Sequence, residues 1–286
     1  MVTTPADILW VIDNSPSMKK HHRNLIRNMN IFINNFITNS QLIKWRMGLL
    51  STSESEAPYI GLSPGNYLDS SDVNPYSRFS SAIFHLGTGG DYEEKSFTPI
   101  RNALESFPDF LRDDSKLFII IVSDEKEQSK ESVEEFLGFL KSLRPLSSIS
   151  AYGIFEKKED GCGGLRFKGS RYDRFIQFTG GLSSEICDDE YGLALAAFST
   201  DIVKKVMTTK IYLDSVPIIE TIQVLYEGGA ISPGKSSEGG YWRYDISENA
   251  ISFHDLSFLK EGDDTEKIKI VFEKMPLFDQ TVGVLD

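Results

Sequence analysis

The sequence is poor in cysteine, has no excess of positive charge and lacks any long hydrophobic run. Its 2 cysteines are too few for a disulfide scaffold or a zinc site, although they can form one bridge. The formal net charge of −12 argues against nucleic acid or anionic lipid as a partner, because both carry negative phosphates. No apolar run approaches the roughly 18 residues that a membrane span needs. We therefore expect a soluble protein whose negative charge favours binding of cations or basic partners.

The composition is that of a globular protein, with 40% hydrophobic and 25% charged residues. A length of 286 residues corresponds to about two ordinary domains, or to one large α/β domain with an addition. The first residues lack the basic start and small-residue cleavage site of a signal peptide. A chain trimmed of its signal would look the same, so the beginning of the sequence does not decide the location.

Short apolar runs alternate with helical patterns through the first 208 residues. The runs at 7–13, 45–52, 116–124 and 149–155 are typical of strands buried on both faces of a sheet. Apolar residues at helical spacing predict helices over 23–38, 99–111, 132–143 and 191–207. Residues 54–90 show no clear periodicity and are expected to form functional loops with short elements inside them. The pattern predicts a doubly wound, Rossmann-like α/β domain with a mostly parallel sheet.

The pattern changes near Thr208. Five segments with β-branched and aromatic residues follow between turn residues, at 210–214, 221–226, 241–245, 250–253 and 267–272. We expect two domains, an α/β domain over residues 1–208 and a small antiparallel β-rich extension over 209–286. Trp242, Tyr244 and Phe253 are expected in the core of that extension rather than on a carbohydrate-binding platform.

Two of the predicted strands end in polar residues. Asp13, Ser15 and Ser17 form a D-x-S-x-S pattern after the first strand, and Asp124 ends the strand at 116–124. In open α/β sheets, ligand sites lie beyond the carboxyl ends of the strands. Carboxylate and hydroxyl oxygens are the ligands that Mg²⁺, Ca²⁺ and Mn²⁺ select. A cation site is one interpretation, and helix capping by the same side chains is the other.

These residues also carry a resemblance to a known family. The segment DILWVIDNSPSM resembles the opening of a von Willebrand factor type A (vWA) domain, with its metal-ion-dependent adhesion site (MIDAS) motif at Asp13, Ser15 and Ser17. The segment FIIIVSDEKE resembles the strand that bears the last aspartate of that site, Asp124. The resemblance covers roughly residues 6–207. It implies a Mg²⁺-centred site that an acidic side chain of a partner completes.

The third motif of the family, usually a Thr shortly before a helix, departs from the pattern here. Counting back from Pro99 places Glu94 at that position, and Thr88 is the rival. Mg²⁺ with three carboxylates, from Asp13, Glu94 and Asp124, leaves a site with a negative charge, whereas a Thr would leave it neutral. A negative site attracts an incoming carboxylate less. We therefore hypothesise that the site favours Ca²⁺, or that Glu94 plugs it until something displaces that side chain.

The two cysteines bear on location. Cys162 and Cys187 lie in Gly/Asp-rich loops, whereas free cysteines are usually buried, so we predict one disulfide bridge. The bridge would contribute about 3 kcal/mol of stability. The segments FLRDDSKLFIIIVSDEKEQS and RYDRFIQFTGGLSSEIC resemble exported bacterial type A domain proteins, many of them lipoproteins. We expect a periplasmic, outer-membrane-anchored or cell-surface protein.

Other motifs have simpler interpretations. GLSPG at 61–65 matches the G-x-S-x-G of serine hydrolases, but Pro64 has no N–H for an oxyanion hole, so a loop is expected. His21 and His22 are expected to be solvated at the start of a helix rather than metal ligands. The acidic stretch 124–135 is interpreted as a helix N-terminus that favours negative charge.

The expected function is adhesion or binding to a protein or cell-surface ligand through the cation site, with no bond making and no enzyme activity. One alternative is a structural component of an envelope complex in which the metal only orders loops. A second is a metal-dependent hydrolase that uses the same carboxylates, although the sequence indicates neither a general base nor a substrate cleft.

Overall fold

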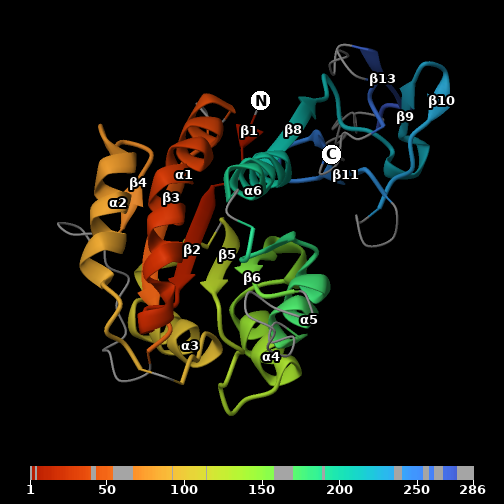
Figure 1. Ribbon diagram of the computed structural model, residues 1–286. Coiled ribbons are helices and arrows are strands. Elements are labelled where there is room, and N and C mark those ends of the chain that lie inside the picture. The colour runs from red at the N-terminus through yellow and green to blue at the C-terminus, as the bar shows by residue number, and fades with distance from the viewer. Residues whose placement is uncertain are drawn as a thin grey trace, which may run out of the picture. The chain divides into compact units, whose positions relative to one another are not determined.

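The computed structural model describes residues 2–3, 5–39, 43–53, 67–91, 93–113, 115–157, 170–188, 191–234, 240–253, 258–260 and 267–275. The chain divides into two compact units (Figure 1). One runs from Thr3 to Val206, and the other combines Val2 with the residues from Met207 onward. We refer to them as the N-terminal unit and the C-terminal unit.

A six-stranded sheet forms the centre of the N-terminal unit. Its spatial order is β4 (Leu68–Asp69), β3 (Trp45–Ser51), β2 (Ala6–Ile12), β5 (Lys116–Ser123), β6 (Ile149–Phe155) and β7 (Ser183–Glu185). All neighbouring strands pair in parallel except β3 and β4. The chain moves from β2 to β3 on one side and then returns to β5 on the other side of β2. This reversal confirms the predicted doubly wound, mostly parallel sheet.

Helices cover both faces of the sheet (Figure 1). One group contains α1 (Lys19–Asn39), α2 (Pro75–Leu86) and α6 (Tyr191–Val206), and the other contains α3 (Phe97–Ser106), α4 (Val133–Leu143) and α5 (Ser170–Thr179). Trp10 of β2 packs against Phe32 of α1 and Phe79 of α2, with ring centroids 5.0 and 5.1 Å apart. Since successive strand residues point to opposite faces, its neighbour Leu9 joins the core of the other face.

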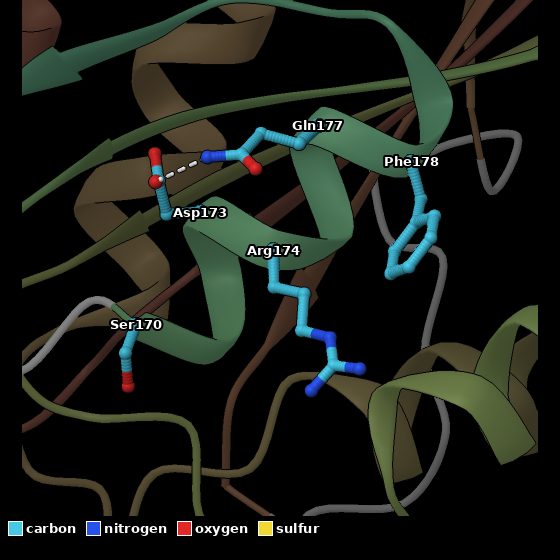
Figure 2. Close-up of a pocket in the computed structure, with 5 residues that line it drawn as sticks. All are labelled: Ser170, Asp173, Arg174, Gln177 and Phe178. Carbon is cyan, nitrogen blue, oxygen red and sulfur yellow. Dashed lines mark hydrogen bonds between the residues drawn. The ribbon is translucent and has the colours of Figure 1, made fainter.

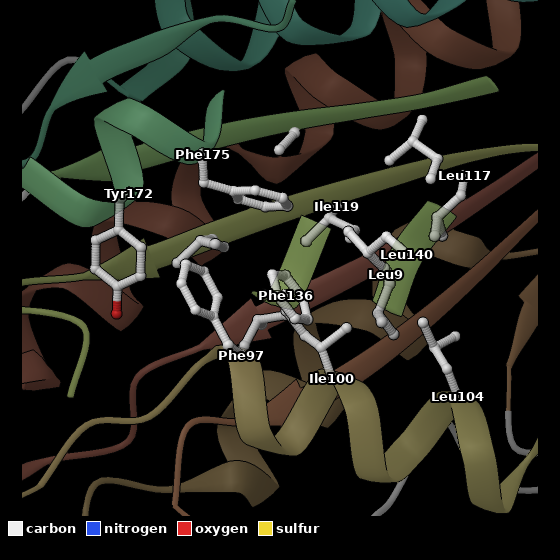
Figure 3. Packing of buried hydrophobic residues seen from close by; sticks show 14 of the residues in the cluster. Leu9, Phe97, Ile100, Leu104, Leu117, Ile119, Phe136, Leu140, Tyr172 and Phe175 are labelled. Atoms are coloured by element: carbon white, nitrogen blue, oxygen red, sulfur yellow. The ribbon is translucent and has the colours of Figure 1, made fainter. Parts of the chain in front are cut away.

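Aromatic side chains fill that other core. Figure 3 shows Phe97 of α3, Phe136 of α4 and Phe175 of α5 gathered over Leu9 and Ile119 of the sheet. The rings of Phe97 and Phe136 stack with centroids 4.4 Å apart. Both faces are therefore buried, which is why the strands are almost wholly apolar.

A buried ion pair joins elements at the amino edge of the sheet. Asp7 has no exposed surface and accepts hydrogen bonds of 2.8 Å from both the backbone N and Nε of Arg112. Ser115 Oγ also donates to Asp7, and Arg144 Nη2 donates to the carbonyl of Arg112 at 3.0 Å. The chain's own arginine thus neutralises the buried carboxylate at this edge.

Two helices of the N-terminal unit were not predicted. The helix α2 lies within the segment expected to be mostly loop, and of its 12 residues only Pro75, Phe79 and Ile83 are buried. The helix α5 buries Tyr172, Phe175, Ile176 and Thr179, which form one stripe at helical spacing. Both helices therefore carry a helical apolar pattern that the sequence prediction missed. The side chain of Asn74 caps the start of α2 by accepting a hydrogen bond from Ser77 N. This cap can be recognised in the sequence only once the helix is known.

The C-terminal unit contains two antiparallel sheets. The first has the order β1 (Val2–Thr3), β8 (Met207–Tyr212), β12 (Ala250–Phe253) and β11 (Trp242–Asp245). The second has the order β10 (Gly229–Ala230), β9 (Gln223–Tyr226) and β13 (Ile268–Val271). Trp242 and Phe253 are buried, as predicted, and Tyr244 is half-buried. The sequence did not anticipate that the first residues of the chain would supply a strand. Among the described residues, no helix is long and apolar enough to cross a membrane.

Candidate metal centre

The carboxyl ends of β2 and β5 lie side by side at the point where the strand order reverses. Ile12 pairs with Val122, and the backbone N of Asp13 donates to the carbonyl of Val122 at 2.9 Å. Asp13 and Asp124 therefore follow adjacent strands onto the same edge, which is where open α/β sheets place ligands.

Hydrogen bonds connect the four residues of the first and last motifs. Asp13 Oδ1 accepts from the backbone N of Ser15 at 2.8 Å. Ser15 Oγ and Ser17 Oγ are 3.0 Å apart, and Ser17 Oγ donates to Asp124 Oδ1 at 3.0 Å. Ser123 Oγ donates to Asp13 Oδ2 at 2.6 Å. The structure thus brings together Asp13, Ser15, Ser17 and Asp124 in one continuous chain of contacts.

The capping interpretation of these residues fails for two of them. Ser15 precedes the short 3-10 turn Pro16–Met18, and its side chain makes no cap hydrogen bond there. The helix after Asp124 is capped by Ser132 in a capping box with Glu135. Neither Ser15 nor Asp124 is therefore needed to satisfy the end of a helix.

Glu94 lies at the same edge and is fully buried. The Thr52 hydroxyl donates to its Oε2, whereas its Oε1 has no hydrogen-bond partner among the described residues. The loop that carries Glu94 is fixed on two sides, because Lys95 N donates to Thr52 O at 3.1 Å and Gln128 N donates to Glu94 O at 2.8 Å. A buried carboxylate oxygen without a partner is costly and indicates a missing cation or donor.

Thr88, the rival for the third position, lies on a neighbouring loop and is half-exposed. That loop approaches the edge through Gly90, whose N donates to Asn14 O at 2.9 Å. A Cβ at Gly90 would lie 2.1 Å from Asn14 Oδ1, so only glycine allows this approach. In the part of the chain that the structure describes, the Thr88 side chain makes no hydrogen bond to Asp13 or Asp124.

Burial shifts the pKa values of two carboxyls. Desolvation raises the pKa of Asp13 to about 6, although hydrogen bonds from Ser123 and Ser15 oppose the shift. Desolvation, followed by the charge of Asp13, raises the pKa of Glu94 to about 8. Within the described residues, neither carboxyl contacts an arginine or lysine.

The donor set fits a divalent cation that prefers oxygen. It consists of three carboxylates and two hydroxyls, and one carboxylate oxygen is unsatisfied. Over the described ranges, no three His, Cys, Asp or Glu side chains form a group that could hold a metal ion. The serine hydroxyls of Ser15 and Ser17 would therefore have to complete the coordination.

The prediction of solvated histidines is wrong. His21 and His22 are 8% and 6% exposed, because α1 begins at Lys19 and turns both rings into the protein. His22 Nε2 lies 2.7 Å from Asp13 O, and His21 Nδ1 lies 2.6 Å from the Tyr191 hydroxyl. Burial lowers the pKa of His22. The His22 ring thus contacts the turn after β2, and the His21 ring links α1 to α6.

Residues that sequence reasoning missed support the site from the end of β3. Ser51 and Ser53 both donate to Asn14 Oδ1, at 2.9 and 2.7 Å, and Thr52 holds Glu94. Their position at the carboxyl end of a predicted strand was the signal that could have identified them. The motif at 61–65 and Cys162 lie outside the described residues. The structure therefore does not test the predicted loop or the predicted disulfide bridge.

A surface pocket lies elsewhere, on α5. A space of about 590 Å³ is lined by Ser170, Asp173, Arg174, Gln177 and Phe178. Figure 2 shows these side chains along the helix. Gln177 Nε2 donates to Asp173 Oδ2 at 2.8 Å, and Arg174 pairs with Glu134 of α4. The pocket shares no residue with the candidate metal centre.

No protein-family model and no curated protein matches the chain. Among solved structures, proximal thread matrix protein 1 (PTMP1) from the mussel byssus is 11% identical over 73% of this chain and 50% of that one, with a TM-score of 0.46. PTMP1 with a zinc-occupied MIDAS motif is 10% identical over 76% and 51%, with a TM-score of 0.47. The ArnB paralog VWA2 from Sulfolobus acidocaldarius is 15% identical over 80% and 53%, with a TM-score of 0.39.

The chain spans about half the length of these structures. The likeness concerns the fold alone, and the six-stranded, mostly parallel sheet between helices is consistent with the type A domain that the sequence resembles. The zinc ion belongs to that PTMP1 structure.

In protein freed of divalent cations, we expect the N-terminal unit to lose stability as the pH rises from about 4.5 to about 8. A carboxyl whose pKa is raised by folding binds its proton more tightly in the folded state. Its stabilising contribution is complete below the unfolded pKa and is lost as the pH rises through the folded value. Urea unfolding in chelator measures this, in a Trp242→Phe background so that Trp10 and Trp45 report only on this unit.

The combined Asp13→Asn and Glu94→Gln variant is the control, since its dependence on pH over this range should be much weaker. Saturating Mg²⁺ or Ca²⁺ should also reduce the slope for the wild-type protein. An identical slope with and without cation would contradict the assignment of these carboxyls to a cation site.

Proposed function

We propose that the N-terminal unit is a metal-dependent binding module that holds a divalent cation with Asp13, Ser15, Ser17, Glu94 and Asp124. The observation that carries the proposal is the chain of hydrogen bonds that joins Asp13, Ser15, Ser17 and Asp124 at one sheet edge, beside the buried Glu94, one of whose oxygens is unpaired. In the described structure, no arginine or lysine contacts Asp13 or Glu94. A divalent cation would supply the missing positive charge and accept that oxygen.

The burial of the donors differs across the site, and this supports a binding role. Asp13 and Glu94 are fully buried, whereas Ser17 is exposed and Asp124 is half-buried. A cation held here would be reached by solvent from the side of Ser17 and Asp124. An acidic side chain of a partner protein or cell-surface ligand is the complementary group, because its oxygens can complete the coordination of a hard cation.

Glu94 sets the charge of the proposed site. Three carboxylates exceed the charge of one divalent cation, so the site with metal bound would still be negative. We propose that this either favours Ca²⁺, which accepts more oxygen ligands than Mg²⁺, or makes Glu94 a plug that an incoming carboxylate must displace. Mn²⁺ is the further oxygen-preferring candidate.

Replacing Glu94 by Thr should change the cation preference and the affinity for acidic ligands. The variant removes one negative charge from the site, so we expect weaker binding of Ca²⁺ relative to Mg²⁺ and tighter binding of a carboxylate ligand once metal is bound. Calorimetric titration with each cation, with and without an acidic peptide, measures both quantities.

Glu93→Thr is the matched control, because Glu93 is an exposed neighbour that pairs with Lys95 and undergoes the same charge change. Equal cation preference in wild-type protein and Glu94→Thr would remove Glu94 from the site.

We propose binding without catalysis, at a bacterial envelope or cell surface. If binding depends on the metal, chelation by EDTA and the Asp13→Ala variant should both abolish attachment of the purified protein to candidate cell surfaces and matrix proteins. Asp109→Ala is the control, because Asp109 is exposed in the turn before β5, which begins at the opposite edge of the sheet.

Other outcomes separate the alternative functions. If EDTA lowers the melting temperature but leaves attachment intact, the metal is structural and the protein is an assembly component. Turnover of phosphodiester or phosphomonoester substrates with Mg²⁺ or Mn²⁺ would instead favour a hydrolase.

The exported location rests on the proposed bridge between Cys162 and Cys187. In protein purified without reductant, we expect mass spectrometry to find neither cysteine reactive toward an alkylating reagent, and both reactive after reduction. Finding both thiols free would argue against an oxidising compartment. The Cys187→Ser variant is the control, since it should leave Cys162 alkylated without reduction.

A further inference from the structure

The loop after β5 contains a buried carboxylate, that of Glu127, which is not a ligand of the proposed metal centre. Glu127 is 3% exposed, and its Oε1 accepts from the backbone N of Ser129 at 2.9 Å. The same oxygen accepts from Ser96 N at 3.2 Å and Phe97 N at 3.5 Å, at the start of α3. Ser96 makes no side-chain cap, so Glu127 satisfies this helix end from another loop.

Two further hydrogen bonds join the segments that carry the proposed metal ligands. Gln128 N donates to Glu94 O at 2.8 Å, and Thr98 N donates to the Ser129 side chain, at Oγ, at 3.1 Å. The segment that begins with Asp124 is therefore held against the segment that begins with Glu94. The separation of two proposed ligands from different parts of the chain depends on these contacts.

Arg171, in the first turn of α5, holds the loop after β5 in place. Its Nη1 lies 2.9 Å from Glu127 Oε2, an ion pair that is not aligned as a hydrogen bond. Nη1 also donates to Ser129 O at 2.8 Å and Glu127 O at 3.3 Å, and Nη2 donates to Glu131 O. One guanidinium group thus spans most of the loop between Asp124 and α4. A planar fork with five donors suits this role, and a lysine could not make the same set of contacts.

A second contact from α5 reaches the other loop. The Tyr172 hydroxyl lies 3.0 Å from Ser96 Oγ, and Tyr172 is fully buried. The guanidinium of Arg171 also lies 5.3 Å from the ring centroid of Phe97. The start of α5 therefore contacts both segments that lead to proposed metal ligands.

We propose that Arg171 and Glu127 are positioning residues that set the affinity of the site for a divalent cation by fixing Asp124 relative to Glu94. The inference rests on the proposed function. Loops that were free to move would lose conformational entropy on binding metal, which would weaken the binding. Because the ion pair already fixes these loops when the protein folds, little of that entropy remains to be lost when the metal binds. Partners outside the coordination shell typically change metal affinity by about 10- to 100-fold.

The other buried ion pair provides a matched control. Arg112 pairs with buried Asp7 at the amino edge of the same sheet, as Arg171 pairs with buried Glu127 at the carboxyl edge. Losing either arginine leaves a buried carboxylate uncompensated and destabilises the fold. Of these two arginines, Arg171 is the one that contacts a loop with a proposed ligand, the loop that begins with Asp124.

The test measures cation affinity and stability in the same variants of the full chain. Arg171→Ala, Arg171→Lys and Glu127→Gln are titrated with Mg²⁺ and Ca²⁺ by calorimetry, and their unfolding in urea is followed in chelator. Amide hydrogen exchange of Ser96, Phe97 and Gln128 is measured without metal. We expect about tenfold weaker cation binding and faster exchange in all three variants. We expect Arg112→Ala to lower stability with cation affinity unchanged.

Each outcome decides the proposal. If the wild-type protein binds no divalent cation, the proposed function fails and this inference fails with it. If the wild-type protein binds metal and the Arg171 and Glu127 variants bind equally well, the positioning role is wrong while the proposed function stands. Equal weakening by Arg112→Ala would also overturn it, because affinity would then follow global stability. If Arg171→Ala does not fold, Arg171→Lys and the isosteric Glu127→Gln provide the comparison.

Discussion

The candidate site depends on the pairing of β2 with β3 on one side and β5 on the other. Because the order of strands reverses at β2, no crossover helix covers the edge where these strands end. The register aligns Ile12 with both Ser51 and Val122, so the polar residues that follow each strand begin at the same level. The burial of apolar side chains on both faces fixes that register, since a shift by one residue would turn Trp10 away from α1 and α2. The hydrophobic core thereby determines where the carboxylates of Asp13 and Asp124 lie.

The same dependence explains what the sequence could and could not predict. Strands buried on both faces leave a strong local signal, and the strand predicted at 149–155 matches β6 at both ends. The sequence could predict that Asp13, Ser15, Ser17 and Asp124 lie close together, because each of them follows such a strand. The contact between Arg171 and Glu127 could not be predicted, because these residues are 44 positions apart in the sequence and the helix that carries Arg171 was not predicted. The acidic stretch 124–135 was interpreted as one helix N-terminus, and this holds for Glu134 and Glu135. Glu127 instead serves the start of α3.

The two edges of the central sheet treat buried charge differently. At the amino edge, Arg112 neutralises Asp7, and the ion pair is complete within the chain. At the carboxyl edge, Asp13 and Glu94 are equally buried, but their described contacts are hydroxyls and backbone N–H groups. Hydrogen bonds of this kind only partly offset the cost of removing a carboxylate from water. The formal charge of the whole chain does not reveal this contrast, because residues 209–286 alone carry 14 acidic and 7 basic residues.

This difference has a consequence for how the two edges respond to their surroundings. An arginine that is part of the chain cannot leave, so the charge balance of the amino edge is the same under all conditions in which the protein is folded. A cation bound at the proposed site would exchange with solvent, so the charge balance of the carboxyl edge would depend on the concentration of that cation and on pH. The ion pair of Glu127 and Arg171, in contrast, belongs to the chain and supports the loop after β5 at all times when the protein is folded. With this permanent support, the proposed site would bind and release a cation without unfolding its loops.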